Sequence, residues 1–441
     1  MQSRLSPRGS SPALGPRAVS TALLCLALFS VSWERLASID VGGLNLKLST
    51  ALFTATLVLT VFDALKFNWR FSKPHKVVFL AFFILGVIAL TIPFATDQAS
   101  AAKQLLTIAL GAVVPLVVII WQGRMYDNLD ILLTYFIRGG WLASIFGLYQ
   151  LAAFYSGLPQ LIDYRDMSGG LGRISAFNYE AAFFAYFLIL VIGAIFARAA
   201  LRGSPAHRGH VAFFIFVIIL ANSRSSFLTL PLLFILLFAS WPKNIAKAKL
   251  LPGLAILSWL TIMVVILVPR FVSSLVTRAT SIFDPTEASS NAPRLNLYAV
   301  SIDIIGDHIL TGIGPGNLIL FAPLYGLPNP VGATSNSVIA NNVWLQALLD
   351  GGPLLLTAQI AFTLIALLQL YNKRLPVSRM LMSGWFATFL ISSFVTSYFY
   401  NTALWVTLAL AIVAADHQGR RLTTDEETPM RAVTLEQNRL R

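Results

Sequence analysis

Three arginines stand where this chain otherwise avoids positive charge. Arg173, Arg224 and Arg294 each lie in a segment poor in lysine and arginine, and Arg224 separates two apolar runs with almost no loop around it. A guanidinium group is planar, permanently charged and able to bind two phosphate oxygens at once. If the three side chains converge, they would form a site for a diphosphate group. Alternatively, Arg224 reaches lipid headgroups while Arg173 and Arg294 pair with nearby acids.

Two other residues could move a proton beside such a site. Glu180 begins an apolar run shortly after Asn178, and His308 follows Asp307 in a polar interval. A carboxylate or an imidazole within hydrogen-bond reach of a hydroxyl can act as a general base. Each residue also has an ordinary structural interpretation, because Glu180 could pair with Arg173 and His308 could be a hydrogen-bonded surface residue.

Asn341 and Asn342 form an amide pair directly before an apolar helical pattern. Asparagine is a good helix N-cap, which would explain one of them, whereas a pair of amides could also orient a sugar hydroxyl.

The segment Gly312-Ile-Gly-Pro-Gly316 lacks the Lys-Ser/Thr that completes a phosphate-binding loop, so it predicts a tight turn. The sequence has no HExxH motif and no cysteine–histidine cluster, so it indicates neither a protein-bound metal nor another cofactor.

Apolar runs must position all of these residues. The chain has 441 residues, of which 56% are hydrophobic and 12% charged, whereas soluble domains carry about 25% charged residues. This composition predicts an all-α polytopic membrane protein. The net charge of +13 does not indicate a nucleic-acid partner, because the basic residues lie in short links between apolar runs, as orientation signals do. The single cysteine, Cys25, excludes an internal disulfide.

The sequence predicts about twelve transmembrane helices, since a spanning helix needs about 20 apolar residues. The seventh, eighth and last runs are short. Between the seventh and eighth, Ser223-Arg224-Ser225 is either a tight turn between two helices or a break within one. The predicted runs are residues 18–33, 46–65, 77–95, 101–121, 131–154, 179–197, 211–222, 226–241, 251–268, 353–370, 380–399 and 402–415.

The positive-inside rule orients these runs. Most of the 32 lysines and arginines fall in alternate links if the N-terminus is inside, and Arg138 lies within the fifth run. Both termini are then predicted to be cytoplasmic. The resulting plan is a cytoplasmic tail (1–17), transmembrane helices 1–9 (18–268), a large, partly helical periplasmic loop (269–352), transmembrane helices 10–12 (353–415) and a second cytoplasmic tail (416–441). A loop of this length is usually functional or disordered, and helical patterning at both its ends argues against disorder.

Four segments, taken in order, resemble the motifs of the O-antigen ligase and polymerase superfamily, bacterial inner-membrane glycosyltransferases of the Wzy and WaaL type. The likeness covers about residues 165–370. Each motif alone is weak, but the ordered set together with the large outer loop is fairly specific. The segments are Gly172-Arg173-Ile-Ser-Ala-Phe-Asn178, Ala221-Asn-Ser-Arg224-Ser, Arg294-x-x-x-Tyr298 followed by Leu310-Thr-Gly-Ile-Gly-Pro-Gly316, and Ala340-Asn-Asn342-Val-Trp-Leu-Gln with Gly351-Gly352.

Three positions depart from the motifs of that superfamily. Asn341 stands where the superfamily has a histidine that is thought to activate the acceptor hydroxyl in ligases. A neutral amide cannot abstract a proton, so the substitution favours a polymerase over a ligase. Ala176 stands where the superfamily has glycine, and Tyr298 where it has tryptophan.

The resemblance implies an inverting, metal-independent enzyme that needs no cofactor. It would transfer a glycan from an undecaprenyl-diphosphate donor to a sugar hydroxyl on the periplasmic face, as an O-antigen or exopolysaccharide polymerase. Arg224 and Arg294, assisted by Arg173, would hold the diphosphate and stabilise the charge that grows as the anomeric bond breaks. Glu180 or His308 would be the base, if one is used. The amide pair Asn341-Asn342 would position the acceptor.

Expected partners are the lipid-linked glycan, an acceptor glycan or lipid A-core, and membrane lipids, with a chain-length regulator protein as a candidate. The first alternative is an O-antigen ligase that attaches glycan to lipid A-core. A second, from another class, is a flippase or transporter of lipid-linked sugars. A transporter should show internal repeats and broken or charged spans near the bilayer midplane, whereas this chain shows no repeat and gathers its charges mostly at the outer rim.

Overall fold

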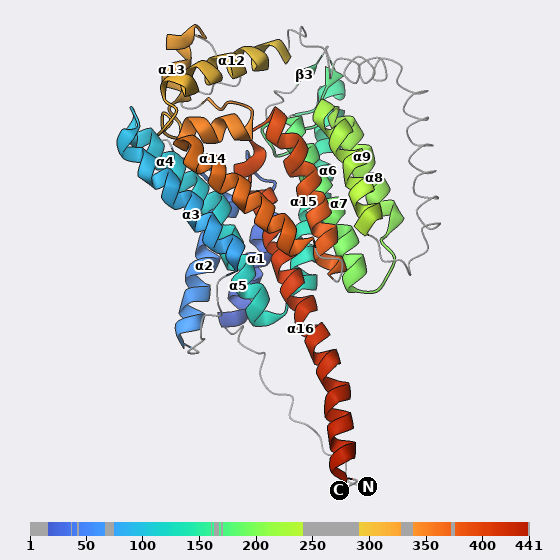
Figure 1. Cartoon of the computed structure of the whole chain (residues 1–441). Helices are drawn as coiled ribbons and strands as arrows, with labels where there is room; N and C mark the ends of the chain where they lie inside the picture. The colour runs from blue at the N-terminus through green and yellow to red at the C-terminus, as the bar shows by residue number, and fades with distance from the viewer. Residues whose placement is uncertain are drawn as a thin grey trace.

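A computed structural model of the chain describes residues 16–36, 38–41, 44–66, 75–159, 161–162, 167–168, 171–240, 291–327, 338–371 and 375–439. Within these ranges the protein is a bundle of helices (Figure 1). Two short antiparallel hairpins, β1–β2 (Ser38–Val41 with Leu44–Lys47) and β3–β4 (Met167–Ser168 with Leu171–Gly172), interrupt the helices. The prediction of a helical membrane protein is confirmed, and the hairpins are additions that the all-α prediction did not contain.

The helices have the following bounds in chain order. They are α1 (Pro16–Phe29), α2 (Leu48–Lys66), α3 (Lys76–Thr91), α4 (Gln98–Ile108), α5 (Val114–Tyr126), α6 (Leu129–Ser156), α7 (Ala181–Leu201), α8 (Arg208–Ala221), α9 (Arg224–Ser240), α12 (Asn291–Asp307), α13 (Leu318–Phe321), α14 (Val343–Leu370), α15 (Pro376–Val395) and α16 (Thr402–Arg439). Short 3-10 turns are η1 (Ile92–Phe94), η5 (Ala322–Tyr325) and η6 (Tyr398–Tyr400), and the π-helical turn η2 (Ala109–Val113) joins α4 to α5.

Six helical segments are long and apolar enough to cross a membrane: Leu48–Lys66, Lys76–Phe94, Gln98–Tyr126, Leu129–Ser156, Ala181–Leu201 and Val343–Leu368. Each predicted run in the described residues coincides with a helix, and the ninth run, 251–268, lies outside them. The number of twelve spans is not confirmed. The apolar stretches of α1, α8 and α9 are shorter than 18 residues, and α15 contains Arg379 and several serines, which lower its hydropathy.

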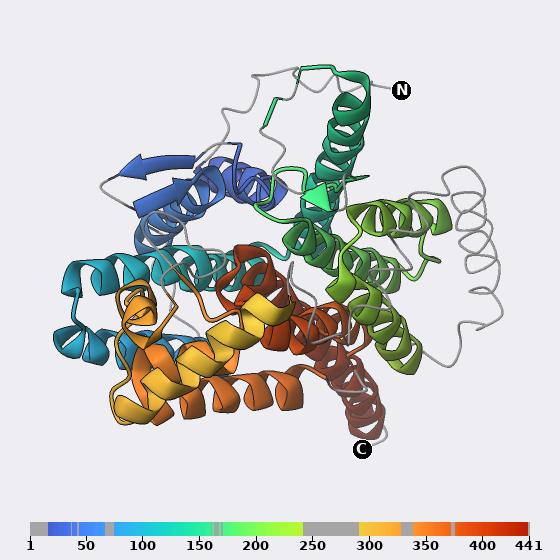
Figure 2. The same cartoon turned by 90° about the horizontal axis from the view of Figure 1, so that it is seen from above.

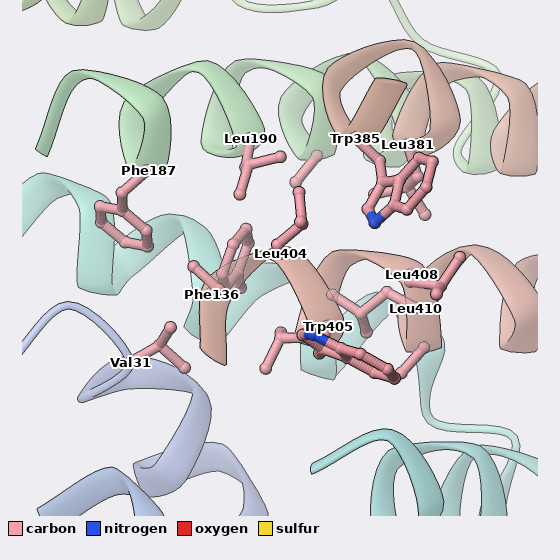
Figure 3. Packing of buried hydrophobic residues seen from close by; sticks show 14 of the residues in the cluster. Val31, Phe136, Phe187, Leu190, Leu381, Trp385, Leu404, Trp405, Leu408 and Leu410 are labelled. Atoms are coloured by element: carbon pink, nitrogen blue, oxygen red, sulfur yellow. The ribbon is translucent and has the colours of Figure 1, made fainter. Parts of the chain in front are cut away.

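Helix α7 is the buried centre of the bundle. It packs against α6, α8, α9, α15 and α16. Figure 3 shows Leu190 of α7 and Leu381 and Trp385 of α15 in one packed layer, and Phe187 of α7 beside Phe136 of α6. Where the two helices cross, a Cβ atom added to Gly193 would lie only 3.4 Å from the Cα atom of Gly384. Small residues at such a crossing allow two backbones to approach closely, which is how helices associate in membranes.

Helix α12 lies across the upper face of the bundle rather than along it (Figures 1 and 2). Its N-terminal end points toward the middle of the molecule, and its C-terminal end leads to α13 above α14 and the α3–α4 pair. Helices α12 and α13 belong to the polar interval 269–352. Residues 269–290 and 328–337 of this interval lie outside the described part of the chain.

The glycine segment Gly312–Gly316 forms the predicted turn. Gly312, Gly314 and Gly316 have φ angles of 66°, 81° and 78°, a region that favours glycine. The Ile313 amide donates to the Leu349 carbonyl over 2.7 Å. This bond fastens the turn to α14 just before the helix breaks at Gly351 and Gly352.

Replacing Gly352 with alanine should destabilise the protein by at least about 2 kcal/mol. Gly352 has a φ of 64°, and an added Cβ would collide with the carbonyl oxygen of Leu310. A matched control is Gly306→Ala in α12, where nothing lies within 4 Å of the added Cβ, so the helix should gain stability slightly. Thermal unfolding of the two purified variants in detergent compares them. Equal midpoints would contradict the close packing of the break against the turn.

Candidate functional site

The segment that carries Arg173 and Glu180 is held in place by a side chain of α6. The Gln150 side-chain oxygen accepts hydrogen bonds from the backbone amides of Ser175 (3.3 Å) and Ala176 (3.0 Å). Ala176 has a φ of 48°, the left-handed conformation that glycine adopts most easily. This conformation gives a physical reason for glycine at the matching position of the superfamily that the chain resembles.

Phe177, in the middle of the same segment, is a second anchor. Its ring stacks on Phe146 of α6 with centroids 4.3 Å apart, and it also contacts Trp33. The backbone carbonyl of Phe177 accepts from the Arg35 amide over 3.0 Å. Side-chain and backbone contacts together therefore fix the path of the chain between Arg173 and Glu180.

Arg224 is the first residue of α9, directly after a tight turn. Helix α8 ends at Ala221 and is capped by Asn222, whose φ of 47° lies in the left-handed region that asparagine tolerates. The Ser226 hydroxyl donates to the Ser223 carbonyl over 2.7 Å and braces the turn. Of the two interpretations of this segment, the structure confirms the turn between two helices. The turn leaves Arg224 partly buried at the helix end.

Tyr186 is the point at which the candidate residues meet. Its side chain is fully buried in α7, six residues beyond Glu180. The hydroxyl group lies near the side chain of Ser225, the neighbour of Arg224, without forming a hydrogen bond in the described residues, and the charges of Arg294 and Glu180 both act on it. The N-terminal end of α7, the start of α9 and the first turn of α12 therefore lie in the same neighbourhood, close enough for their charged and polar groups to act on one hydroxyl.

A second tyrosine holds the Arg294 end of α12 in place. The Tyr298 hydroxyl, one helical turn beyond Arg294, lies 3.0 Å from the Asn341 carbonyl and 2.8 Å from the Phe394 carbonyl at the end of α15. Burial raises the pKa of Tyr298, and the charge of Arg294 opposes that rise. The hydroxyl thus stays protonated and can donate to either carbonyl. Tryptophan, which the superfamily has here, is also a donor.

The amide pair has two distinct conformations. Asn342 caps α14, because its side-chain oxygen accepts from the amides of Trp344 (2.9 Å) and Leu345 (3.1 Å). This confirms the capping interpretation for Asn342. Asn341 instead has a φ of 53°, and within the described residues no hydrogen bond holds its side chain. Its partly buried amide is the one of the pair that could contact a ligand.

His308 is separated from the arginines by the length of α12. It follows the last residue of that helix, fourteen positions beyond Arg294, which corresponds to about 21 Å at 1.5 Å per residue. Its ring packs edge-on against Phe321, with centroids 5.2 Å apart. The structure therefore brings Glu180 close to the residues around Tyr186 and does not bring His308 there.

Sequence reasoning assigned no role to a polar chain that supports Asn341 from inside α14. The Gln346 side-chain oxygen accepts from the Ala340 amide over 2.8 Å, and its amide group donates to the Asp350 carboxylate over 2.7 Å. Both side chains are buried. The spacing of four residues places them on the same face of the helix, and this spacing was a signal that could have indicated the pair.

Lys47 was also missed as a neighbour of the site. Its ammonium group lies 3.0 Å from the Glu34 carboxylate, which also accepts from Asn401 over 2.9 Å. The ammonium group lies 5.8 Å from the ring centroid of Tyr179, the residue before Glu180. Glu34 is only 4% exposed, and a buried carboxylate of this kind needs such partners. In the sequence, Lys47 is one of the few basic residues in the links predicted to be outside, and this position could have indicated a role for it.

In the described ranges no three His, Cys, Asp or Glu side chains form a group that could hold a metal ion.

Comparison with known proteins finds a family model that matches part of this chain. Residues 209–360 match the family model described as O-antigen ligase (Wzy_C), which confirms the resemblance seen in the motifs. Enzymes of this family transfer glycans from lipid-linked carriers. The matched region contains Arg224, Arg294 and Asn341, whereas Arg173 and Glu180 precede it. The chain has no match among the curated proteins.

Replacing Tyr298 with phenylalanine should lower stability by about 1–2 kcal/mol and reduce glycan transfer. The substitution removes the hydrogen-bond donor for the partly exposed carbonyls of Asn341 and Phe394, so a tertiary hydrogen bond is lost. It also loosens the attachment of the Arg294 end of α12.

Tyr325→Phe is the matched control. Its hydroxyl bonds to Asp307 over 2.6 Å at the opposite end of α12. Thermal unfolding and transfer activity, measured together, should change in Tyr298→Phe only. If Tyr325→Phe impairs transfer as strongly, Tyr298 has no specific positioning role.

Proposed function

We propose that this protein is an O-antigen or exopolysaccharide polymerase, and the match of residues 209–360 to the O-antigen ligase family model supports this. It transfers a glycan from an undecaprenyl-diphosphate donor to a sugar hydroxyl on the periplasmic face of the bacterial inner membrane. The observation that carries the proposal is the convergence of Glu180, the Arg224 turn and Arg294 around the Tyr186 hydroxyl. Positive charges at this point suit a leaving group with two phosphates.

In this proposal Arg224 and Arg294 bind the diphosphate and Arg173 assists them. The acceptor hydroxyl attacks the anomeric carbon, and the bond from that carbon to the phosphate oxygen breaks. The electron pair leaves with the diphosphate, so negative charge grows on its oxygens. Guanidinium groups that are already fixed in position stabilise that charge without reorganising. Tyr298 supports the arrangement because it attaches α12 to α14 and α15.

The proton of the acceptor hydroxyl goes to the Glu180 carboxylate. Glu180 is exposed at the N-cap position of α7, and its charge acts on the Tyr186 hydroxyl. His308 is less suited, because about 21 Å of helix separate it from Arg294. The Asn341 amide orients the acceptor sugar. It cannot take the proton itself, and this supports a polymerase rather than a ligase.

An O-antigen ligase is the second candidate, because the matched family model bears that description. It would pass the glycan to lipid A-core instead of a growing glycan. Both candidates use the same donor and the same arginines. In both, the termini are cytoplasmic, the polyprenyl chain lies against membrane-facing helices, and a chain-length regulator protein is a partner to be tested.

A deletion strain distinguishes the two candidates. Without a polymerase, single repeats should remain attached to the surface lipid, and the long-chain ladder on a gel should disappear. Complete loss of attachment, with lipid-linked polymer accumulating, would support the ligase instead.

Complementation of that strain then tests the arginines. Arg224→Ala and Arg294→Ala should each lower polymerisation by about 100-fold or more, because each removes a donor to the developing charge. Lys103→Ala is a matched control, since Lys103 is an exposed cation on α4. An unchanged ladder in either arginine variant, at wild-type protein level, would exclude the proposed diphosphate site.

Glu180 and His308 can be compared directly. Glu180→Gln should slow transfer by about 100-fold, because the amide cannot accept a proton, while donor binding stays close to that of the wild type. His308→Gln should leave the rate within about twofold. Transfer rates with purified protein and lipid-linked donor measure both, and the opposite ranking would move the role of base to His308.

A further inference from the structure

A cavity of about 230 Å³ lies between α6, α7 and the start of α8. Its lining includes Arg138, Arg198, Arg202, His207 and His210. Arg198 lies in the last turn of α7, whereas Glu180 precedes its first turn. The 21 residues of α7 span about 30 Å, so the cavity is on the opposite side of the bundle from the candidate site. The positive-inside rule predicts that this side is cytoplasmic.

The cavity has more positive than negative charge. Asp130 binds Arg202 through two bonds of 2.6 and 2.7 Å, and it also accepts from Arg198 over 3.2 Å. One carboxylate therefore pairs with two guanidinium groups, and its single negative charge balances only one of their two positive charges. Within the described ranges no acid forms an ion pair with Arg138. The excess of positive charge in the cavity lining therefore favours the binding of an anion.

Arg138 lies on a helix face that is otherwise apolar and exposed. Ile131 and Ile145, seven residues before and after it on α6, are 47% and 56% exposed. This spacing returns to the same face of a helix, so Arg138 lies among side chains suited to lipid. Its guanidinium is 5.2 Å from the ring centroid of Tyr135. The long side chain therefore bends toward the start of α6, as arginines do when they reach the membrane surface.

The N-terminus of α8 adds to the positive character of the cavity. His207 occupies the N-cap position and makes no side-chain capping bond, so the first amides of this 14-residue helix present the positive end of the helix dipole. His210 packs edge-on against Trp141, which is stacked on Phe213 at 4.3 Å. Tryptophan is enriched where membrane meets water.

From this arrangement we propose that the cavity binds the phosphate-bearing headgroup of an anionic phospholipid from the cytoplasmic leaflet. Arg138 binds the phosphate together with the α8 N-terminus, and the acyl chains run toward the membrane centre along the exposed side chain of Ile145 on α6. Basic pockets between helices on this side of a membrane suit anionic headgroups. A free phosphate ion shares the headgroup chemistry, but it has no apolar part to match the exposed isoleucines.

Thermal unfolding and native mass spectrometry of the full-length protein in a nonionic detergent test the proposal. The probes are phosphatidylglycerol, phosphatidylethanolamine and inorganic phosphate at equal phosphate concentration. Phosphatidylglycerol should raise the unfolding midpoint and remain bound in the mass spectrum, and the other two should do neither. Arg138→Gln should weaken phosphatidylglycerol binding by about tenfold, the effect of losing one charge-assisted contact.

Lys76→Gln is the control, because Lys76 is an exposed cation on the same predicted side but outside the cavity. It should bind phosphatidylglycerol like the wild type. Equal binding by Arg138→Gln and wild type would overturn the proposal, and so would equal effects of the two lipids. Stabilisation by inorganic phosphate equal to that by phosphatidylglycerol would identify a free-anion site instead. Arg138 is exposed, so its replacement should not prevent folding, and the mass spectrum reports binding independently of stability.

Discussion

The close crossing of α7 and α15 is the contact on which the rest of the structure depends. Lipid tails are as apolar as the helices, so packing and not water exclusion must hold helices together in a membrane. The small residues Gly193 and Gly384 allow that packing. Helix α7 then carries Glu180 and Tyr186 at one end, and the last turn of α15 contains Phe394, whose carbonyl lies beside the Tyr298 hydroxyl. One packed pair of helices thereby determines where two sides of the candidate site lie.

Tyrosine hydroxyls connect elements that are distant in sequence. Tyr186 lies among Ser225, Arg294 and Glu180, and Tyr298 links α12 to α14 and α15. Because the Tyr186 side chain is fully buried, the charges that act on its hydroxyl are screened less than they would be in water. A site built in this way holds its charges in place before the substrate arrives, which suits a reaction whose main demand is stabilisation of a leaving diphosphate. The charged groups gather at the two ends of the helices, and the apolar centre separates the candidate transfer site from the cavity beside Arg138.

Several features could be predicted because they depend on a few neighbouring residues. Apolar runs long enough for helices, an interruption at Ser223-Arg224-Ser225 and the glycine turn at 312–316 all follow from local preferences for burial and for particular backbone angles. The Asn342 cap is another local feature. The number of spans was harder to predict, since short helices such as α8 owe their place to packing against α7 as much as to their own length.

The sequence by itself therefore determined the class of protein, the resemblance to the O-antigen ligase family and the positions of the candidate arginines. Only the tertiary structure decided which of these residues meet. Arg294 and His308 belong to one polar interval in the sequence, yet a straight helix keeps them about 21 Å apart. Glu180 and Arg294 are more than a hundred residues apart, yet both act on Tyr186. Periodicity and composition report the environment of each residue along its own helix, and distances between helices arise only when their surfaces pack.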